Sequence, residues 1–303
     1  MQFSVWPDPS HTPTEVIDIA HWAERSGWFG LWYADHYMPN TGTLEIKPGD
    51  VHECWAMLAA IAAVTTKIRI GSLVSPTSVH HPAVLANRSA TIDHISGGRM
   101  VLGLGAGWQI NEHHAYGIEL EPPGPRVTRF EEAVQIVRSL HTQPRTTFEG
   151  SVYTIRDATA DPKPVQSPLP ILVGTASPRM LRITGHHADE WNTWGGRQWA
   201  AERRATFETA MAGVGRDLST IHTSVQALIA ITDSDAVRDK VLAGAMGPRS
   251  IAGSVDELVD TLGWYGELGF DEFIVPDFTL GSTQVERAER LDQIDRQLVA
   301  QLT

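Results

Sequence analysis

The sequence lacks the features that define several common protein classes. Its single cysteine, Cys54, excludes an internal disulfide bond and a cysteine-based zinc site. The 24 basic residues form no cluster and stand against 36 acidic ones, so the net charge is −12 and nucleic-acid binding is not expected. The longest apolar run, Trp55 to Val64, is about half a membrane span. The first residues lack a basic segment followed by an apolar one, so we expect a cytoplasmic protein without a secretory signal.

The chain instead has ample apolar material in a regular order. Of its 303 residues 42% are apolar, which is enough for a packed core. Short apolar runs alternate with longer segments of helical periodicity, at about 38 residues per unit, which predicts one (β/α)8 TIM barrel domain over residues 1–303 with insertion segments. The eight predicted strands are Gln2–Trp6, Phe29–Ala34, Ile68–Val74, Met100–Leu104, Ile171–Gly174, Glu190–Trp194, His222–Ile231 and Glu272–Pro276.

Capping signals and two irregular segments complete the predicted fold. Thr12-Pro13 starts a helix, and capping boxes occur at Ser254 and Thr283. The segment at about 142–170 is rich in Pro, Thr and Asp, and we expect an excursion with a small hairpin there. The segment at about 242–253 contains Gly and Pro and is expected to be a flexible loop.

Functional residues of such a barrel gather at the carboxyl ends of the strands. His36 follows the second strand and is the best candidate acid or base, because histidine titrates near neutrality, although a surface-loop histidine is the alternative. Ser177-Pro178 begins a helix directly after a strand, where free N–H groups attract phosphate, unless it is an ordinary helix cap. The glycines of 103–107 would allow close approach to a ligand, but they also suit a flexible turn.

Three adjacent histidine pairs give little support for a metal site. Neighbouring side chains on a strand or helix diverge, so two of them do not hold one ion. The sequence also has no His-Glu-x-x-His motif, and no metal site is predicted. Small and aromatic residues at the strand ends favour a pocket for a flat, apolar ligand that carries an anion.

Taken in order, several segments resemble the luciferase-like monooxygenase superfamily, and most closely its branch that uses the deazaflavin coenzyme F420. The resemblance covers almost the whole chain, and the shared order of the segments is more specific than any one of them. The segments that carry it are Leu31–His36, Ile68–Ser72, His81–Ala83, Ile92–Arg99, Gly103–Trp108, Arg126–Glu132, Phe148–Gly150, Pro162–Gln166, Pro170–Gly174 and Ala188–Trp194.

The resemblance implies a barrel that binds the cofactor across the strand ends, usually as a homodimer. Asp35 and His36 become the candidate catalytic residues, with Asp35 also beside the deazaflavin. In relatives, a bulge with a non-prolyl cis peptide lies behind the cofactor ring, at the position of Ser72 and Leu73. The implied cofactor-binding residues are Asp35, Ser72, Leu73, Gly105, Ala106, Gly107, Asn111 and, at the phosphate, Gly174, Thr175, Ala176 and Ser177.

The chain departs from the relatives that oxidise glucose 6-phosphate. Those relatives carry Glu at the position of Trp108 and Trp at the position of Asn40, so that reaction is in doubt here. Arg197 matches a basic position that holds substrate phosphate in them, and a solvated loop cation is the alternative. The residues expected to form the substrate pocket are Trp6, Trp108, Trp194, Arg197 and Phe278.

The function expected from these observations is hydride transfer between F420 and a small organic substrate. The deazaflavin performs the redox chemistry, while the protein orients it and handles protons. One alternative is a monooxygenase that uses FMN with a partner reductase. Another is a deazaflavin-binding protein without turnover.

Overall fold

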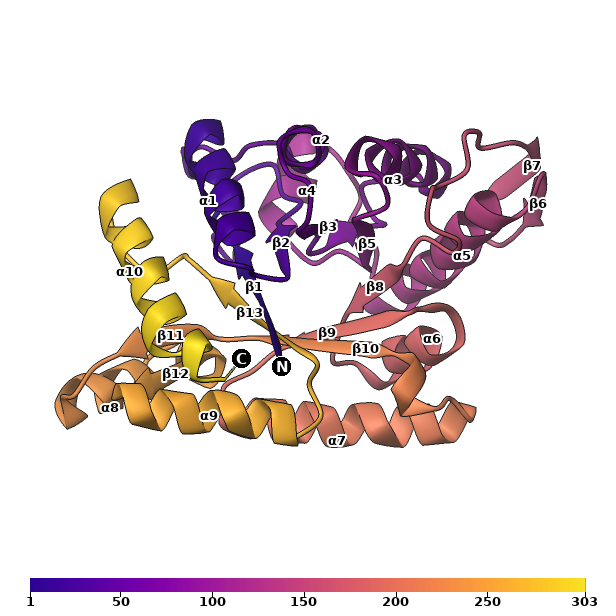
Figure 1. The fold of residues 1–303 in the computed structure, drawn as a ribbon. Coiled ribbons are helices and arrows are strands. Elements are labelled where there is room, and N and C mark those ends of the chain that lie inside the picture. Colours follow the sequence, from indigo (N-terminus) through magenta and orange to yellow (C-terminus); the bar gives the residue numbers. More distant parts are fainter. Residues whose placement is uncertain (303) are drawn as a thin grey trace.

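A closed barrel of parallel strands is the centre of the computed structural model, which describes residues 1–302 (Figure 1). The pairing of β3 with β5 and of β13 with β1 closes the ring, and every pairing within it is parallel. The predicted (β/α)8 TIM barrel is therefore confirmed. In the order of the ring, the barrel strands are β1 (Gln2–Trp6), β2 (Gly30–Tyr33), β3 (Arg69–Ser72), β5 (Met100–Gly105), β8 (Ile171–Gly174), β9 (Glu190–Trp194), β10 (His222–Gln226) and β13 (Glu272–Pro276).

Helices connect successive strands and cover the outside of the barrel (Figure 1). The Thr12 hydroxyl caps the first helix, and Ser254 and Thr283 form the two predicted capping boxes. Cys54 begins the second helix and is fully buried, as predicted. The covering helices are α1 (Pro13–Arg25), α2 (Cys54–Val64), α3 (Pro82–Ser96), α4 (Ile110–Tyr116), α5 (Pro123–Thr142), α6 (Pro178–His187), α7 (Arg197–Val214), α9 (Val255–Glu267) and α10 (Gln284–Gln297).

The apolar residues form two separate clusters. The larger one packs the helices against the outer faces of the strands, with members such as Phe130, Phe207 and Leu262. The smaller one joins side chains from facing strands, and therefore fills the inside of the barrel. Its members include Trp6, Leu73 and Ile274, with Trp194 and Phe278 packed against it. The interior thus becomes aromatic toward the carboxyl ends of the strands.

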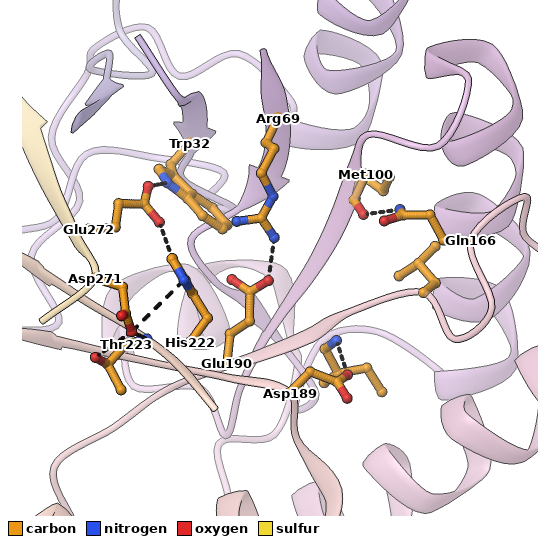
Figure 2. Close-up of polar contacts among 12 residues, drawn as sticks. Trp32, Arg69, Met100, Gln166, Asp189, Glu190, His222, Thr223, Asp271 and Glu272 are labelled. Atoms are coloured by element: carbon orange, nitrogen blue, oxygen red, sulfur yellow. Dashed lines mark hydrogen bonds and ion pairs between the residues drawn. The ribbon is translucent and has the colours of Figure 1, made fainter. Parts of the chain in front are cut away.

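The amino end of the barrel is polar and holds a network of charged side chains (Figure 2). Arg69, Glu190, His222 and Glu272 are each the first residue of a barrel strand. Arg69 forms an ion pair with Glu190, and His222 Nε2 lies 3.0 Å from Glu272 Oε2. The Trp32 indole also donates to Glu272, at 2.7 Å. The two ends of the barrel interior therefore differ in chemistry, with ion pairs at the amino end and aromatic rings at the other.

The excursion expected at about 142–170 contains the predicted hairpin. Antiparallel strands β6 (Thr146–Glu149) and β7 (Thr154–Ala158) lie beside α5 at the edge of the molecule (Figure 1). A second short segment, β4 (Ser75–Pro76), pairs with β5 just beyond β3. The peptide bond between Leu73 and Val74 is cis, one position after the Ser72–Leu73 bond that the family resemblance suggested.

The structure corrects two details of the predicted strands. The expected strand His222–Ile231 divides at Ala227, and its second half, β11 (Leu228–Ile231), leaves the barrel and pairs with β12 (Ser250–Gly253). The pairing joins segments that are distant in the chain, so β12 could not be predicted from its local sequence. The segment 242–253, expected as a loop, therefore contains regular structure, which also includes the short helix η2 (Gly247–Arg249). Helix α8 (Asp235–Ala243) lies between β11 and β12 in the chain.

Candidate active site at the carboxyl ends of the strands

A cavity of about 740 Å³ opens where the barrel strands end. Trp6, Trp194 and Phe278 form an aromatic wall, with ring centres 5.4 Å apart for Trp6 and Trp194 and 5.0 Å apart for Trp6 and Phe278. Leu73 and Val74 add apolar surface. The cavity lies at the end of the barrel expected to carry function, and it offers an apolar, aromatic surface for a ligand.

His36 lines this cavity, and a buried carboxylate holds its ring. His36 follows β2, and its Nδ1 lies 3.0 Å from Oε1 of Glu112 in the first turn of α4. The other carboxylate oxygen of Glu112 accepts the Tyr37 backbone N–H at 2.9 Å. Since Nδ1 faces Glu112, Nε2 is the ring nitrogen left for a ligand. The carboxylate favours the tautomer with the proton on Nδ1, so Nε2 can accept a proton.

Asp35 lies behind the cavity wall rather than on it. Its side chain is fully buried, and Oδ2 accepts hydrogen bonds from the Trp55 indole at 3.1 Å and from the Ser75 hydroxyl. His80 Nε2 lies 2.9 Å from the same oxygen. Burial raises the pKa of the Asp35 carboxyl, but the hydrogen bonds from His80 and Ser75 more than offset this effect and hold the pKa below its usual range. Contact between Asp35 and a cofactor stays a prediction.

A smaller hollow of about 290 Å³ adjoins the main cavity. The two share His36, Val74 and Trp108 as well as Gly174 and Thr175. Beyond these shared residues, the lining of the smaller hollow includes Gly105 at the end of β5, Ala106 and Gly107 after it, Glu112 of α4, Arg126, and Ser177 at the start of α6. Ser177 caps α6 by accepting the Met180 N–H, so the positive end of a helix faces this hollow. A long ligand could span both spaces, with an anionic part near α6.

The glycines at this end of the barrel make room for the bulge that follows β3. A Cβ atom at Gly103 would lie 1.9 Å from the Ser72 carbonyl oxygen, and one at Gly105 would lie 2.7 Å from a methyl group of Val74. A Cβ atom at Gly174 would lie 3.1 Å from the other methyl group of Val74. The glycines therefore make room for the backbone of Ser72 and the side chain of Val74, and not for a ligand alone.

Two more of the residues expected at the cofactor are fully buried and hold the surrounding loops. The Ser72 hydroxyl donates to the Gly103 carbonyl at 2.9 Å, and the Asn111 amide donates to the Pro39 carbonyl at 2.8 Å. Neither lines the cavities, whereas Leu73, Gly174, Thr175 and Ala176 line the larger one. The Asn111 bond ties helix α4 to the loop after β2, which forms part of the cavity rim.

Trp108 stands at the boundary between the two spaces. Its ring packs edge-on against His36, with ring centres 5.5 Å apart, and 56% of the residue is exposed. A tryptophan here cannot exchange protons. The side chain can therefore shape the ligand surface around His36, but it cannot act as an acid or base.

The arginines that line the cavity are not the one that the sequence predicted. Arg197, at the start of α7, stacks on the Trp264 ring and does not line the cavity. Arg203 and Arg249 line it instead. Arg203 lies six residues further along α7, so it points from another face of the helix than Arg197 does. Arg249 belongs to η2, within the segment expected as a loop. These two residues and Glu112 were missed, because only the folded chain brings them to His36 and the aromatic wall.

Two further properties concern the described residues as a whole. Within residues 1–302, no three His, Cys, Asp or Glu side chains come together in a way that could hold a metal ion. In the same range, every helix is too short or too polar to cross a lipid bilayer.

The fold and this site define a parallel barrel with a ligand cavity, an oriented histidine and an aromatic wall at its carboxyl end. The sequence profile of the luciferase-like monooxygenase family matches residues 1–301, and the chain belongs to this family.

Named relatives show how far the sequence similarity extends. The F420-dependent glucose-6-phosphate dehydrogenase of Kineococcus radiotolerans is 33% identical over 178 residues, which cover 58% of this chain and 51% of that enzyme. The chain thus matches only about half the length of this relative. The enzyme of the same name from Nakamurella multipartita is 31% identical over 81% of this chain and 73% of its own length.

A solved structure confirms the fold at low identity. The coenzyme F420-dependent tetrahydromethanopterin reductase of Methanopyrus kandleri has a TM-score of 0.83 with this chain. The two are 19% identical, and the match covers 100% of this chain and 99% of the reductase. The similarity therefore extends over the whole barrel, including its insertions.

Proposed function

We propose that this protein is a coenzyme F420-dependent oxidoreductase that moves a hydride between the deazaflavin and a small organic substrate. The observation that carries the proposal is the His36–Glu112 pair, which holds a proton-handling nitrogen at the junction of the two ligand spaces. The names of the Kineococcus and Nakamurella relatives support F420 as the cofactor.

The residues at the strand ends fit this cofactor. Leu73, Val74 and the aromatic wall give a flat ring system apolar surface on which to pack. The backbone of 105–107, the start of α6 and Arg126 line the smaller hollow, and they suit the anionic tail. In this arrangement the ring lies in the larger cavity and the phosphate lies at Ser177.

The chain contributes proton handling and orientation to the reaction. When bound, F420 supplies or accepts a hydride at C5 of its ring. Moving a hydride to or from a carbon that bears oxygen changes the proton affinity of that oxygen. We propose that His36 Nε2 gives or takes this proton, while Glu112 holds the ring in place and stabilises its protonated form. Trp108 and the aromatic wall would give the reacting atoms apolar surroundings.

The proposal is tested directly by measuring which cofactor the protein binds. We expect the purified apoprotein to bind F420 in a fluorescence titration and FMN at least about tenfold more weakly, a difference of about 1.4 kcal/mol. Oxygen uptake with reduced FMN and a flavin reductase is the control for a monooxygenase. FMN binding together with oxygen-dependent product would replace the proposal with the FMN-dependent alternative. Tight F420 binding without reduction by a panel of alcohols, sugars and enones would favour a carrier.

We further propose that the protein acts as a homodimer in the cytoplasm. Val64 of α2 together with Val84 and Ile95 of α3 leaves apolar surface exposed on two adjacent helices, which supports self-association. A lone buried cysteine suits a reducing compartment. Light scattering on the eluting protein tests the first point, because a mass near that of one chain would contradict it. Cell fractionation tests the second.

A further inference from the structure

Two arginines of the main cavity have no acidic partner. Arg203 donates to the Trp194 carbonyl, and its guanidinium lies 3.4 Å from the Thr193 hydroxyl. The guanidinium carbon of Arg249 lies 5.4 Å from the centre of the Trp194 ring. Within residues 1–302, neither side chain forms an ion pair with a carboxylate. The cavity therefore holds two positive charges beside an aromatic surface, and neither belongs to an ion pair among these residues.

The charge balance at this position is unfavourable without a ligand. Burial lowers the pKa of Arg203 and the positive charge of Arg249 lowers it further, while the negative charge of Glu202 offsets these effects only in part. Asp8 and Asp50 also line the cavity, but neither pairs with these arginines. The Asp8 carboxylate instead accepts the Ser10 N–H of its own loop at 2.9 Å. An external anion would relieve the repulsion between the two guanidinium groups and accept their free N–H donors.

The proposed cofactor does not need these arginines for its own negative charge. Its anionic tail has a separate place in the smaller hollow, which contains Arg126 and the start of α6. Arg203 and Arg249 line only the larger cavity, on the side of Trp194. The pair is therefore left for a second ligand that lies against the aromatic wall.

We propose that Arg203 and Arg249 bind the anionic group of the substrate, and that the substrate is an organic oxyanion whose flat or apolar body packs on Trp194 and Trp6. The anionic group is a carboxylate or a phosphate, both of which match the paired donors of a guanidinium. This inference rests on the proposed function, because it assigns the remaining part of the same cavity to the substrate.

Binding to the cofactor-free protein tests this inference without turnover. The probes are benzoate and phenyl phosphate, with benzyl alcohol as the neutral control, and the signal is tryptophan fluorescence. We expect at least one anion to bind about tenfold or more tightly than benzyl alcohol, and Arg203→Gln and Arg249→Gln each to remove most of that preference. Arg197→Gln, on the same helix but outside the cavity, is the matched control and should keep the preference.

Two further measurements separate this inference from the proposed function. F420 should bind the wild type and both glutamine variants with similar affinity. Loss of F420 binding in the variants, with anion binding unchanged, would assign the arginines to the cofactor and overturn the inference. Wild-type protein that binds F420 but shows no preference for anions would overturn it too, whereas failure of the wild type to bind F420 would contradict the proposed function.

Folding is checked by thermal melting, because Arg203 also holds the Trp194 carbonyl. Among the described residues, the Arg249 side chain contacts the Trp194 ring and donates no hydrogen bond, so Arg249→Gln should melt close to the wild type. If Arg203→Gln unfolds, Arg249→Gln still decides the outcome. A folded Arg249→Gln protein with full anion preference would contradict a paired site.

Discussion

The ring of His36 and the carboxylate of Glu112 form a pair, with Nδ1 3.0 Å from Oε1, although the two residues are 76 positions apart in the chain. His36 is about one-fifth exposed at the cavity, whereas Glu112 is 2% exposed behind it. The histidine can therefore reach a ligand in the main cavity. Glu112 lines only the adjoining hollow, so in the main cavity it acts through the histidine.

Replacing His36 with Asn should slow turnover by about 10²–10⁴-fold, because the variant lacks a group that exchanges protons near neutral pH. F420 affinity should change little, because the cofactor packs mainly on other surfaces. Steady-state rates beside a fluorescence titration of F420 measure both effects. Unchanged turnover would remove His36 from proton handling, and an equal loss of binding and turnover would make it a residue that shapes the cofactor site.

Glu112→Gln keeps the shape of the side chain and can still accept the Tyr37 N–H, but it removes the negative charge beside His36. We expect kcat to fall about tenfold or more, within the contribution of a general acid or base. We also expect the melting temperature and the F420 affinity to change little, because the variant keeps the hydrogen bond from Tyr37. The comparison of kcat with these two properties distinguishes positioning from a structural role. A fall in kcat together with a lowered melting temperature would indicate that Glu112 only supports the fold.

Ala176→Asp should weaken F420 binding, because it places a negative charge beside the start of α6, where the cofactor phosphate is proposed to bind. A tenfold loss corresponds to about 1.4 kcal/mol. Ala176→Asn is the matched control, since it adds similar volume without charge. The titration is done at low and high salt, and the effect of Asp should shrink at high salt. Equal losses for Asp and Asn would point to steric exclusion instead of charge.

Gly103→Ala should destabilise the protein by about 1–3 kcal/mol, because the new methyl group would overlap the Ser72 carbonyl 1.9 Å away. Gly124→Ala is the control in α5, where nothing lies within 4 Å of the added atom. That change should be neutral or stabilise the protein by about 0.4–1 kcal/mol. Urea unfolding of the two variants gives the comparison. Equal stability for both would show that the bulge after β3 adjusts freely.

His222 should make stability decline on the alkaline side. Burial lowers its pKa, but the hydrogen bond and charge of Glu272 outweigh this and raise the pKa above its ordinary value. The contribution of protonated His222 is therefore complete below about pH 6.5 and is lost as pH rises through the raised folded-state pKa. Glu272, with a pKa held below its usual range, stays ionised throughout. The unfolding free energy of the wild type should fall from about pH 6.5 to 9 more steeply than that of His222→Gln, and equal slopes would contradict the assignment.

The sequence was most informative where local chemistry decides the structure. Buried parallel strands are continuous apolar runs, and helix starts carry caps such as Thr12 and Ser254, so most barrel elements could be predicted. Position along a strand then placed His36 and Trp194 at the cavity. Contacts between distant segments could not be predicted, because no local pattern in the sequence indicates them. The partner of β11, the carboxylate behind His36 and the arginines beside Trp194 depend on how the chain closes on itself.

The polar network at the amino end of the barrel affects how a ligand can enter and leave the cavity. Arg69, Glu190, His222 and Glu272 place paired charges at that end of the barrel, which opposes the passage of a small apolar molecule. We therefore expect a molecule that reaches His36 to enter and leave through the opposite end. A substrate and a long cofactor would then share one entrance, and the ligand nearer the rim would have to leave first.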